Sequence, residues 1–285
     1  MGDFRGLVAA FARTGDELCH IAGTGSPYTL PIAGRPLIRH AIRSLCDAGI
    51  DEILVVVEPA LAEEIVVAVG DPGVTLHYAL EQDRSEDALV RAAREALGAG
   101  PILVHLADSL LPAGFAPQPA TAYTTANQVI VYPLDETEVE HAELDGVWRY
   151  DGTVDGVLDA NSSALDDLKR ARIGADLTNA SVQGRVSIHP TAVLQGAKIR
   201  GPVCIGPEAR IIETYIGPYT SIGAGVELEG VEIENSIVLP GAQIRFPGRR
   251  LEASLVGEGA QIGRDYTLPS ALRLRVGPGA DIQLS

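Results

Sequence analysis

The chain divides into two regions in which hydrophobic residues are spaced differently. Up to about residue 175, short apolar runs alternate with amphipathic stretches, which is typical of a sheet with helices packed on its faces. Strands are predicted at residues 6–12, 53–58, 74–80 and 102–107, and helices at residues 35–48 and 85–97. Strands joined by helices predict a mostly parallel sheet, whose ligands lie beyond the carboxyl ends of the strands.

From residue 182 onward an aliphatic residue recurs about every six positions. The recurring positions are Val182, Ile188, Leu194, Ile205, Ile211, Ile216, Ile222, Leu228, Ile233 and Leu239. A parallel β-helix needs this hexapeptide period, because successive coils stack their aliphatic corners on one another. Residues 268–284 depart from the period and predict the atypical end of the stack.

Charge and composition exclude several classes of function. The chain has 22 Lys and Arg against 38 Asp and Glu, a net charge of −16, which disfavours a nucleic-acid partner. No apolar run approaches the roughly 18 residues that span a bilayer, and the first residues lack the apolar core of a signal peptide. We therefore expect a cytoplasmic protein with no membrane partner.

Several segments resemble one enzyme family. Residues 5–8 (Arg-Gly-Leu-Val), 30–38 (Leu-Pro-Ile-Ala-Gly-Arg-Pro-Leu-Ile) and 146–153 (Gly-Val-Trp-Arg-Tyr-Asp-Gly-Thr) are similar to segments of sugar-1-phosphate nucleotidyltransferases. Residues 215–223 (Tyr-Ile-Gly-Pro-Tyr-Thr-Ser-Ile-Gly) resemble the long-form glucose-1-phosphate thymidylyltransferases. The resemblance implies a truncated Rossmann-like α/β domain in residues 1–175 and a left-handed parallel β-helix in residues 176–285.

The resemblance also implies roles for particular residues. In the family a sugar phosphate attacks the α-phosphate of a nucleoside triphosphate, while a Gly-rich loop, an Arg and a Lys bind the phosphates and two aspartates hold Mg²⁺. Asp108 matches a metal-binding and catalytic position, and Gln82 matches the residue that reads the base. Asp151 is expected as the second Mg²⁺ ligand, one residue away from the family position, which Tyr150 occupies. Arg13 is the expected nucleotide-binding cation.

The chain departs from the family pattern in three places. Phe11 and Ala12 stand where two glycines would let phosphate approach the backbone, so Arg13 or residues 23–25 would have to form a substitute anion site. The only lysines are Lys169 and Lys198, and neither fits the family's catalytic lysine.

The third departure is length. About 40 residues lie between Asp108 and Trp148, where the family has more than twice as many and holds the sugar. The pattern in this interval predicts a Pro-rich connection and one strand at residues 128–134. The acidic run at residues 136–143 is expected to lie in a solvated loop.

These departures favour a nucleotidyltransferase-like protein with lost or strongly altered catalysis, acting as a binding or assembly subunit in sugar-nucleotide or secondary metabolism. The first alternative is an active Mg²⁺-dependent sugar-1-phosphate nucleotidyltransferase. Expected ligands are a nucleotide or sugar phosphate, with Mg²⁺ only where a nucleotide binds. Expected protein partners are further copies of the chain, or an active nucleotidyltransferase in a hetero-oligomer.

Two further alternatives rest on histidines and acidic residues. A new reaction in the remodelled pocket would use Asp16, His20, His77, His105 or Asp108, with His77 and His105 expected on neighbouring strands. A β-helix acyltransferase would need a base, and His189 is the only histidine in that region. Its place before Pro190 favours a structural role.

Overall fold

The chain folds into two compact units. The computed structural model describes residues 4–11, 17–118, 120–126, 128–134, 138–168, 172–173, 176–265, 271–276 and 282. The sheet unit is drawn from residues 1–15, 25–30 and 35–150, and the coil unit from residues 16–24, 31–34 and 151–285. The domain boundary expected between residues 175 and 176 stays a prediction.

The sheet unit is built on a seven-stranded sheet in the order β10-β8-β9-β6-β1-β4-β5. Its strands are β1 (Arg5–Ala10), β4 (Glu52–Val57), β5 (Thr75–Leu80), β6 (Ile102–Leu106), β8 (Thr121–Thr125), β9 (Gln128–Pro133) and β10 (Glu140–Glu143). Strands β6, β1, β4 and β5 are parallel, and Leu7 of β1 lies between Leu54 of β4 and Val104 of β6. The mostly parallel sheet predicted from the sequence is confirmed.

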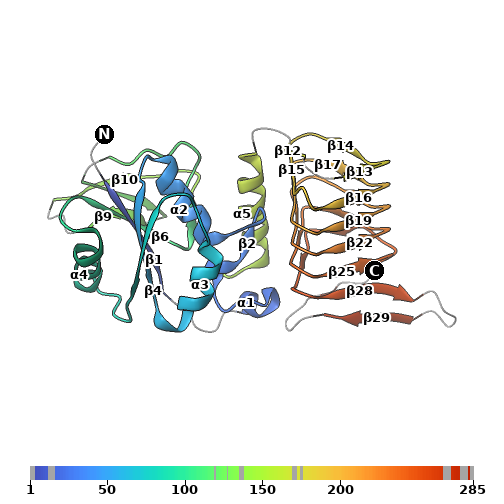
Figure 1. Cartoon of the computed structure of the whole chain (residues 1–285), viewed down its shortest axis with the longest axis horizontal. Coiled ribbons are helices and arrows are strands. Elements are labelled where there is room, and N and C mark those ends of the chain that lie inside the picture. Colours follow the sequence, from blue (N-terminus) through green and yellow to red (C-terminus); the bar gives the residue numbers. More distant parts are fainter. Residues whose placement is uncertain are drawn as a thin grey trace. The chain divides into compact units, whose positions relative to one another are not determined.

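Helices cover both faces of this sheet (Figure 1). Alternation along β1 sends Val8 toward α2 (Leu37–Asp47) and α3 (Ala62–Val69), and Leu7 toward α4 (Glu86–Leu97). Shorter elements of the unit are η1 (Pro27–Thr29), β3 (Arg35–Pro36), η2 (Pro59–Leu61), β7 (Ser109–Leu110) and β11 (Trp148–Arg149). Because both faces are covered, the buried residues of β1 and β4 are apolar, and β6 adds one buried polar residue, His105.

The coil unit contains three stacked parallel sheets (Figure 1). Val186, Val203 and Thr220 occupy matching positions on successive coils, so one coil takes 17 residues, close to three hexapeptides. The column of side chains inside the coils consists of Val, Ile, Leu and Ala. This is the left-handed parallel β-helix that the sequence predicts, and its aliphatic repeat is confirmed as the core.

Each coil from β12 to β26 contributes one strand to each of the three sheets, and the last coil contributes to two of them. One contains β12 (Arg172–Ile173), β15 (Val186–Ile188), β18 (Val203–Ile205), β21 (Thr220–Ile222), β24 (Ile237–Val238) and β27 (Leu255–Val256). The second contains β13 (Asp176–Thr178), β16 (Val193–Gln195), β19 (Arg210–Ile212), β22 (Glu227–Glu229), β25 (Gln243–Arg245), β28 (Gln261–Asp265) and β29 (Ala271–Arg275). The third contains β14 (Ser181–Gln183), β17 (Lys198–Arg200), β20 (Tyr215–Ile216), β23 (Glu232–Glu234) and β26 (Leu251–Glu252). Strand β29 runs antiparallel to β28 and ends the parallel order.

The coil unit also holds α1 (Glu17–Ala22), β2 (Pro31–Ile32) and α5 (Val154–Asp166). Asn161 of α5 is fully buried and joins three segments of the unit. Its Oδ1 accepts from the Ala33 amide at 2.9 Å and from the Ser221 hydroxyl, and its Nδ2 donates to the Tyr219 carbonyl at 3.0 Å. A buried amide with these partners fixes α5 against the coils.

Two expectations about the sheet unit are wrong. The interval between Asp108 and Trp148 holds three strands of the main sheet, β8, β9 and β10, where one was predicted. Part of the acidic run, expected in a loop, is the edge strand β10, which pairs in parallel with β8. Edge strands expose one side to water, so an alternation of charged residues is compatible with a strand there.

The expectation that His77 and His105 lie on neighbouring strands is also wrong. His77 lies on β5 and His105 on β6, and β1 and β4 separate these two strands in the sheet. The reason is that the chain returns to the centre of the sheet after the β5–α4 segment, which consecutive order in the sequence does not reveal. In a further finding, no helix among the described residues is long and apolar enough to cross a membrane.

Candidate functional site

The candidate site lies at the carboxyl edge of the parallel strands, as the sheet topology predicts. Phe11, Glu58, Glu81 and Asp108 follow the last residues of β1, β4, β5 and β6 or lie one residue further on. We call the region formed by these four residues and the loops after Glu58, Glu81 and Asp108 the carboxyl edge. The four residues belong to the sheet unit.

Asp108 is the most buried carboxylate of the carboxyl edge. Its side chain is only 7% exposed. Arg149 donates from Nε to Asp108 Oδ2 at 3.2 Å and from Nη1 to Gln128 Oε1 at 2.7 Å. The arginine side chain is 24% exposed, so the guanidinium borders solvent while the carboxylate beneath it is enclosed. A charge-assisted pair of this kind holds the guanidinium in one position.

Backbone pairing brings Arg149 to Asp108. Strands β7 and β11 are antiparallel, with Arg149 opposite Ser109 and Trp148 opposite Leu110. The Tyr150 amide donates to the Asp108 carbonyl at 2.8 Å and extends this ladder by one bond. Asp108 and Arg149, 41 positions apart in the sequence, are therefore held together by backbone hydrogen bonds of their neighbours as well as by their own side chains.

A buried histidine supports the turn that carries Asp108. His105 is fully buried, with Nδ1 3.3 Å from the Ala41 carbonyl and Nε2 3.1 Å from Ser109 Oγ. A carbonyl can only accept, so Nδ1 carries the proton and Nε2 faces the serine hydroxyl. Burial lowers the pKa of His105 to about 4, so the imidazole is neutral near pH 7. Its contacts assign it to the support of the turn.

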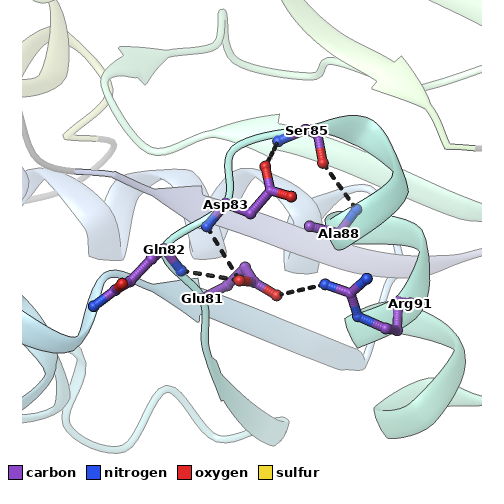
Figure 2. A network of polar contacts seen from close by, with 6 residues as sticks. All are labelled: Glu81, Gln82, Asp83, Ser85, Ala88 and Arg91. Carbon is purple, nitrogen blue, oxygen red and sulfur yellow. Dashed lines mark hydrogen bonds and ion pairs between the residues drawn. The ribbon is translucent and has the colours of Figure 1, made fainter.

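Gln82 lies on the loop between β5 and α4. Carboxylates of this loop accept hydrogen bonds from its backbone amides and hold it in place (Figure 2). Glu81 Oε1 accepts from the amides of Gln82 and Asp83 at 3.0 and 3.1 Å, and Glu81 Oε2 pairs with Arg91 at 3.2 Å. The hydrogen bond from the Asp83 amide is the main cause of the lowered pKa of the Glu81 carboxyl. Figure 2 shows the Gln82 carboxamide pointing away from this network. The side chain is exposed and available to a ligand.

The same loop is fixed further along by the start of α4. Asp83 Oδ1 accepts from the Ser85 amide at 2.9 Å, a bond that lowers the pKa of Asp83. Ser85 Oγ in turn accepts from the Ala88 amide at 3.3 Å and caps the helix, as its Ser-Glu-Asp sequence predicts. The backbone on both sides of Gln82 is thereby held in place.

The end of β1 has no backbone cradle for phosphate at Phe11. The carbonyl of Phe11 accepts from the Tyr28 hydroxyl, and its ring lies under the Arg84 guanidinium at 5.6 Å. Arg84 also pairs with Glu58 Oε2 at 3.4 Å. The Phe11 side chain therefore stands at one of the two positions at which the resembled family has glycines.

The alternative of a substitute anion site at residues 23–25 is contradicted by the hydrogen bonds of these residues. The amides of Gly23 and Thr24 donate to the carbonyls of His20 and Cys19 at the end of α1. The Gly25 amide donates to Glu64 Oε1 at 3.1 Å. Since carbonyls and a carboxylate of the chain already take these three donors, they are not open to phosphate.

The remaining predicted site residues are Arg13, Asp16 and Asp151. Arg13 and Asp16 lie outside the described residues. Asp151 belongs to the coil unit, where its Oδ1 accepts from the amide and the hydroxyl of Thr153, both at 2.9 Å. Thr153 in turn caps α5 through a bond from the Gly156 amide. In these contacts Asp151 supports the start of a helix.

A protein-held Mg²⁺ site does not fit the geometry around Asp108. Mg²⁺ needs open carboxylate oxygens, but a guanidinium lies on Oδ2 and the side chain is nearly enclosed. The next residue after Arg149 is Tyr150, which is 3% exposed and is no metal ligand of this type. Within the part of the chain that the structure describes, no three His, Cys, Asp or Glu side chains are grouped as metal ligands.

Sequence reasoning missed Arg149 and Gln128 as members of this site. Both are polar residues beside apolar or aromatic ones, and Arg149 stands between Trp148 and Tyr150. The pairing of β7 with β11 joins positions about 40 residues apart, so local spacing does not reveal it. The available signal was a charged residue between two aromatic residues.

Comparisons with known proteins agree with the fold and identify a family. The family model described as "MobA-like NTP transferase domain" matches residues 25–193. The low-salt glycan biosynthesis nucleotidyltransferase Agl11 of Haloferax volcanii is 28% identical, over 95% of this chain and 98% of the relative. A glucose-1-phosphate thymidylyltransferase of Streptomyces griseus is 25% identical over 95% and 97%.

A second thymidylyltransferase matches a shorter stretch. The glucose-1-phosphate thymidylyltransferase of Streptomyces antibioticus is 32% identical over 52% of this chain and 41% of the relative. The alignment with the Haloferax protein extends over 349 residues, more than the 285 of this chain. The relative therefore carries residues that have no counterpart here.

Proposed function

The chain belongs to the MobA-like NTP transferase family, and from this premise we propose that it transfers a nucleotidyl group to a sugar 1-phosphate at the carboxyl edge. In this reaction a phosphate oxygen of the sugar phosphate forms a bond to the α-phosphorus of a nucleoside triphosphate. The bond between that phosphorus and the bridging oxygen breaks, and pyrophosphate leaves. Mg²⁺ enters with the triphosphate, as part of the substrate.

The observation that carries the proposal is the placement of Asp108 and Arg149 at the end of β6, where an open parallel sheet binds its ligands. Two relatives that are nucleotidyltransferases by name match over almost their whole length and support the same class of reaction. The exposed carboxamide of Gln82, held out by the β5–α4 loop, is suited to hydrogen-bond a base.

A subunit that binds without transferring is the second candidate, because specific observations favour it. The two lysines are Lys169 and Lys198, so residues 1–168 offer none to balance charge on a triphosphate. Arg84 and Arg149 each lie against a carboxylate, so neither adds an uncompensated positive charge for a triphosphate. In this role the chain would bind a sugar phosphate or nucleotide within a homo-oligomer, or beside an active nucleotidyltransferase.

Pyrophosphate release by the purified chain separates the two candidates. The assay uses Mg²⁺, each nucleoside triphosphate in turn and a panel of sugar 1-phosphates. We expect release that requires a sugar 1-phosphate and falls at least a hundredfold in Asp108→Asn, since loss of Asp108 frees Arg149 from its position. The matched control Asp87→Asn changes an exposed carboxylate and should keep the wild-type rate. Release no greater than that of Asp108→Asn with every pair of substrates would reject transfer in favour of the second candidate.

A further inference from the structure

The guanidinium of Arg149 is anchored on one side and open on the other. Nε donates to Asp108 and Nη1 to Gln128, while the side chain keeps 24% of its surface exposed. A guanidinium has five N–H donors in a planar fork. Among the described residues, no protein acceptor takes Nη2, so this end of the fork is free for a ligand.

The anchoring groups determine what kind of ligand fits. Asp108 is nearly enclosed and faces the arginine, and Gln128 directs its carbonyl oxygen at the same head group. A cation at this place would meet the guanidinium at close range and be repelled. An oxyanion would meet free N–H donors in a fork whose geometry matches two phosphate oxygens.

We propose that Arg149 binds the phosphate of a sugar 1-phosphate directly, and that Asp108 is a positioning residue for this arginine where the family pattern implies a metal ligand. The proposal takes its ligand class from the proposed function and assigns the phosphate to one side chain. It makes binding of the sugar phosphate independent of divalent cations. The antiparallel pair β7–β11 and the amide of Tyr150 keep the backbone of Arg149 fixed beside Asp108.

Titration calorimetry of the full chain with glucose 1-phosphate tests the proposal. The titration is run once in EDTA and once in excess Mg²⁺, and we expect dissociation constants that agree within about twofold. Arg149→Gln should weaken binding at least tenfold, about 1.4 kcal/mol. Arg149→Lys should recover only part of the loss, because an ammonium lacks the fork. Asp108→Asn should weaken binding less than Arg149→Gln does and leave it independent of Mg²⁺.

A matched control and a direct metal readout complete the test. Arg43→Gln removes an exposed arginine that also pairs with an aspartate and should leave binding unchanged. The Mn²⁺ electron paramagnetic resonance spectrum of the free protein should be that of the unbound ion, in wild type and in Asp108→Asn. Near-ultraviolet circular dichroism verifies that each variant is folded.

Several results would overturn the assignment. These are binding that requires Mg²⁺, bound Mn²⁺ that Asp108→Asn abolishes, full binding by a folded Arg149→Gln protein, and no binding of glucose 1-phosphate at all. Failure of the proposed function differs from these outcomes. Metal-independent binding that Arg149→Gln weakens, without any release of pyrophosphate, would reject transfer and retain the assignment of Arg149.

Discussion

The two units of the chain have cores that are built in different ways. The coil unit stacks Val, Ile, Leu and Ala side chains in a column that repeats with every coil. The sheet unit has a comparable apolar core, but at its carboxyl edge the buried set includes His105, Asp108 and Ser109. Both units bury neutral polar residues, but among the described residues the carboxylate and the imidazole that are buried, Asp108 and His105, both belong to the sheet unit. The comparison teaches that repetition specifies the coil unit, whereas the sheet unit places buried ionisable groups near its carboxyl edge.

The largest expected effect comes from Asn161, a buried polar residue of the coil unit. Asn161→Ala leaves the Ala33 amide, the Ser221 hydroxyl and the Tyr219 carbonyl without their partner. Since an unsatisfied buried group costs about 1–3 kcal/mol, we expect the free energy of unfolding to fall by about 4 kcal/mol. Denaturant unfolding followed by far-ultraviolet circular dichroism measures the loss.

The control for this variant is Ser163→Ala, which changes an exposed residue of the same helix. It should alter the free energy of unfolding by less than about 0.5 kcal/mol. The only tryptophan, Trp148, belongs to the sheet unit, so its fluorescence follows that unit separately. An Asn161→Ala protein as stable as Ser163→Ala would show that the buried amide does not fix α5.

A cavity among the aliphatic side chains inside the coils should lower the free energy of unfolding slightly less than Asn161→Ala does. Ile222 is fully buried between Ile205 and Val238 of the neighbouring coils. Ile222→Ala removes three carbons and is expected to lower the free energy of unfolding by about 3.5 kcal/mol. The circular dichroism transition should move to lower denaturant while the Trp148 transition stays.

Val193→Ala is the control, because that side chain is 50% exposed on the surface of the coils. Its expected effect is below about 0.5 kcal/mol. If both variants lost the same stability, the interior column would not be the main source of order in the coil unit.

The free energy of unfolding of the sheet unit should depend on pH through the buried side chain of His105. His105 has its pKa lowered to about 4 by burial, against 6.5 for an ordinary histidine. Between these values the unfolded chain binds more protons, so the free energy of unfolding falls as the pH drops from about 6.5 to 4. The total is about 3 kcal/mol, and above pH 6.5 His105 adds no pH dependence.

Urea unfolding followed by Trp148 fluorescence, at pH values between 7 and 4.5, measures this contribution. His105→Gln should lose that part of the pH dependence, whereas the control His77→Gln, at a partly exposed site, should keep it. Identical pH profiles for wild type and His105→Gln would contradict the assignment of a buried neutral imidazole.

The smallest expected effect concerns the β5–α4 loop. Gln82→Ala removes an exposed carboxamide without disturbing the bonds that Glu81 makes to the loop backbone. Under the proposed function, we expect a change of a few fold in the relative kcat/KM for different nucleoside triphosphates, with little change in stability. Gln118→Ala, at another exposed glutamine of the sheet unit, should leave the relative values unchanged. Equal preferences in wild type and Gln82→Ala would remove Gln82 from base recognition.

The sequence predicted most of the helices and strands but few of the pairings between distant segments. The predicted apolar runs correspond to β1, β4, β5 and β6, and the hexapeptide repeat corresponds to the coil core, because burial imposes a period on neighbouring residues. The position of β1 in the middle of the sheet, the strand β10 within an acidic run, and the contact of Arg149 with Asp108 were not predicted. Each depends on pairing between distant segments, which leaves no local period.

Product analysis tests the central claim most directly. The purified chain is incubated with Mg²⁺, thymidine triphosphate and glucose 1-phosphate, and in parallel with the other triphosphates, and the mixture is analysed by liquid chromatography and mass spectrometry. Our account predicts a nucleotide sugar and pyrophosphate in equal amounts from at least one pair, and neither in Asp108→Asn. Metal-independent binding of the sugar phosphate without any nucleotide sugar from any pair would contradict transfer and identify the chain as a binding subunit.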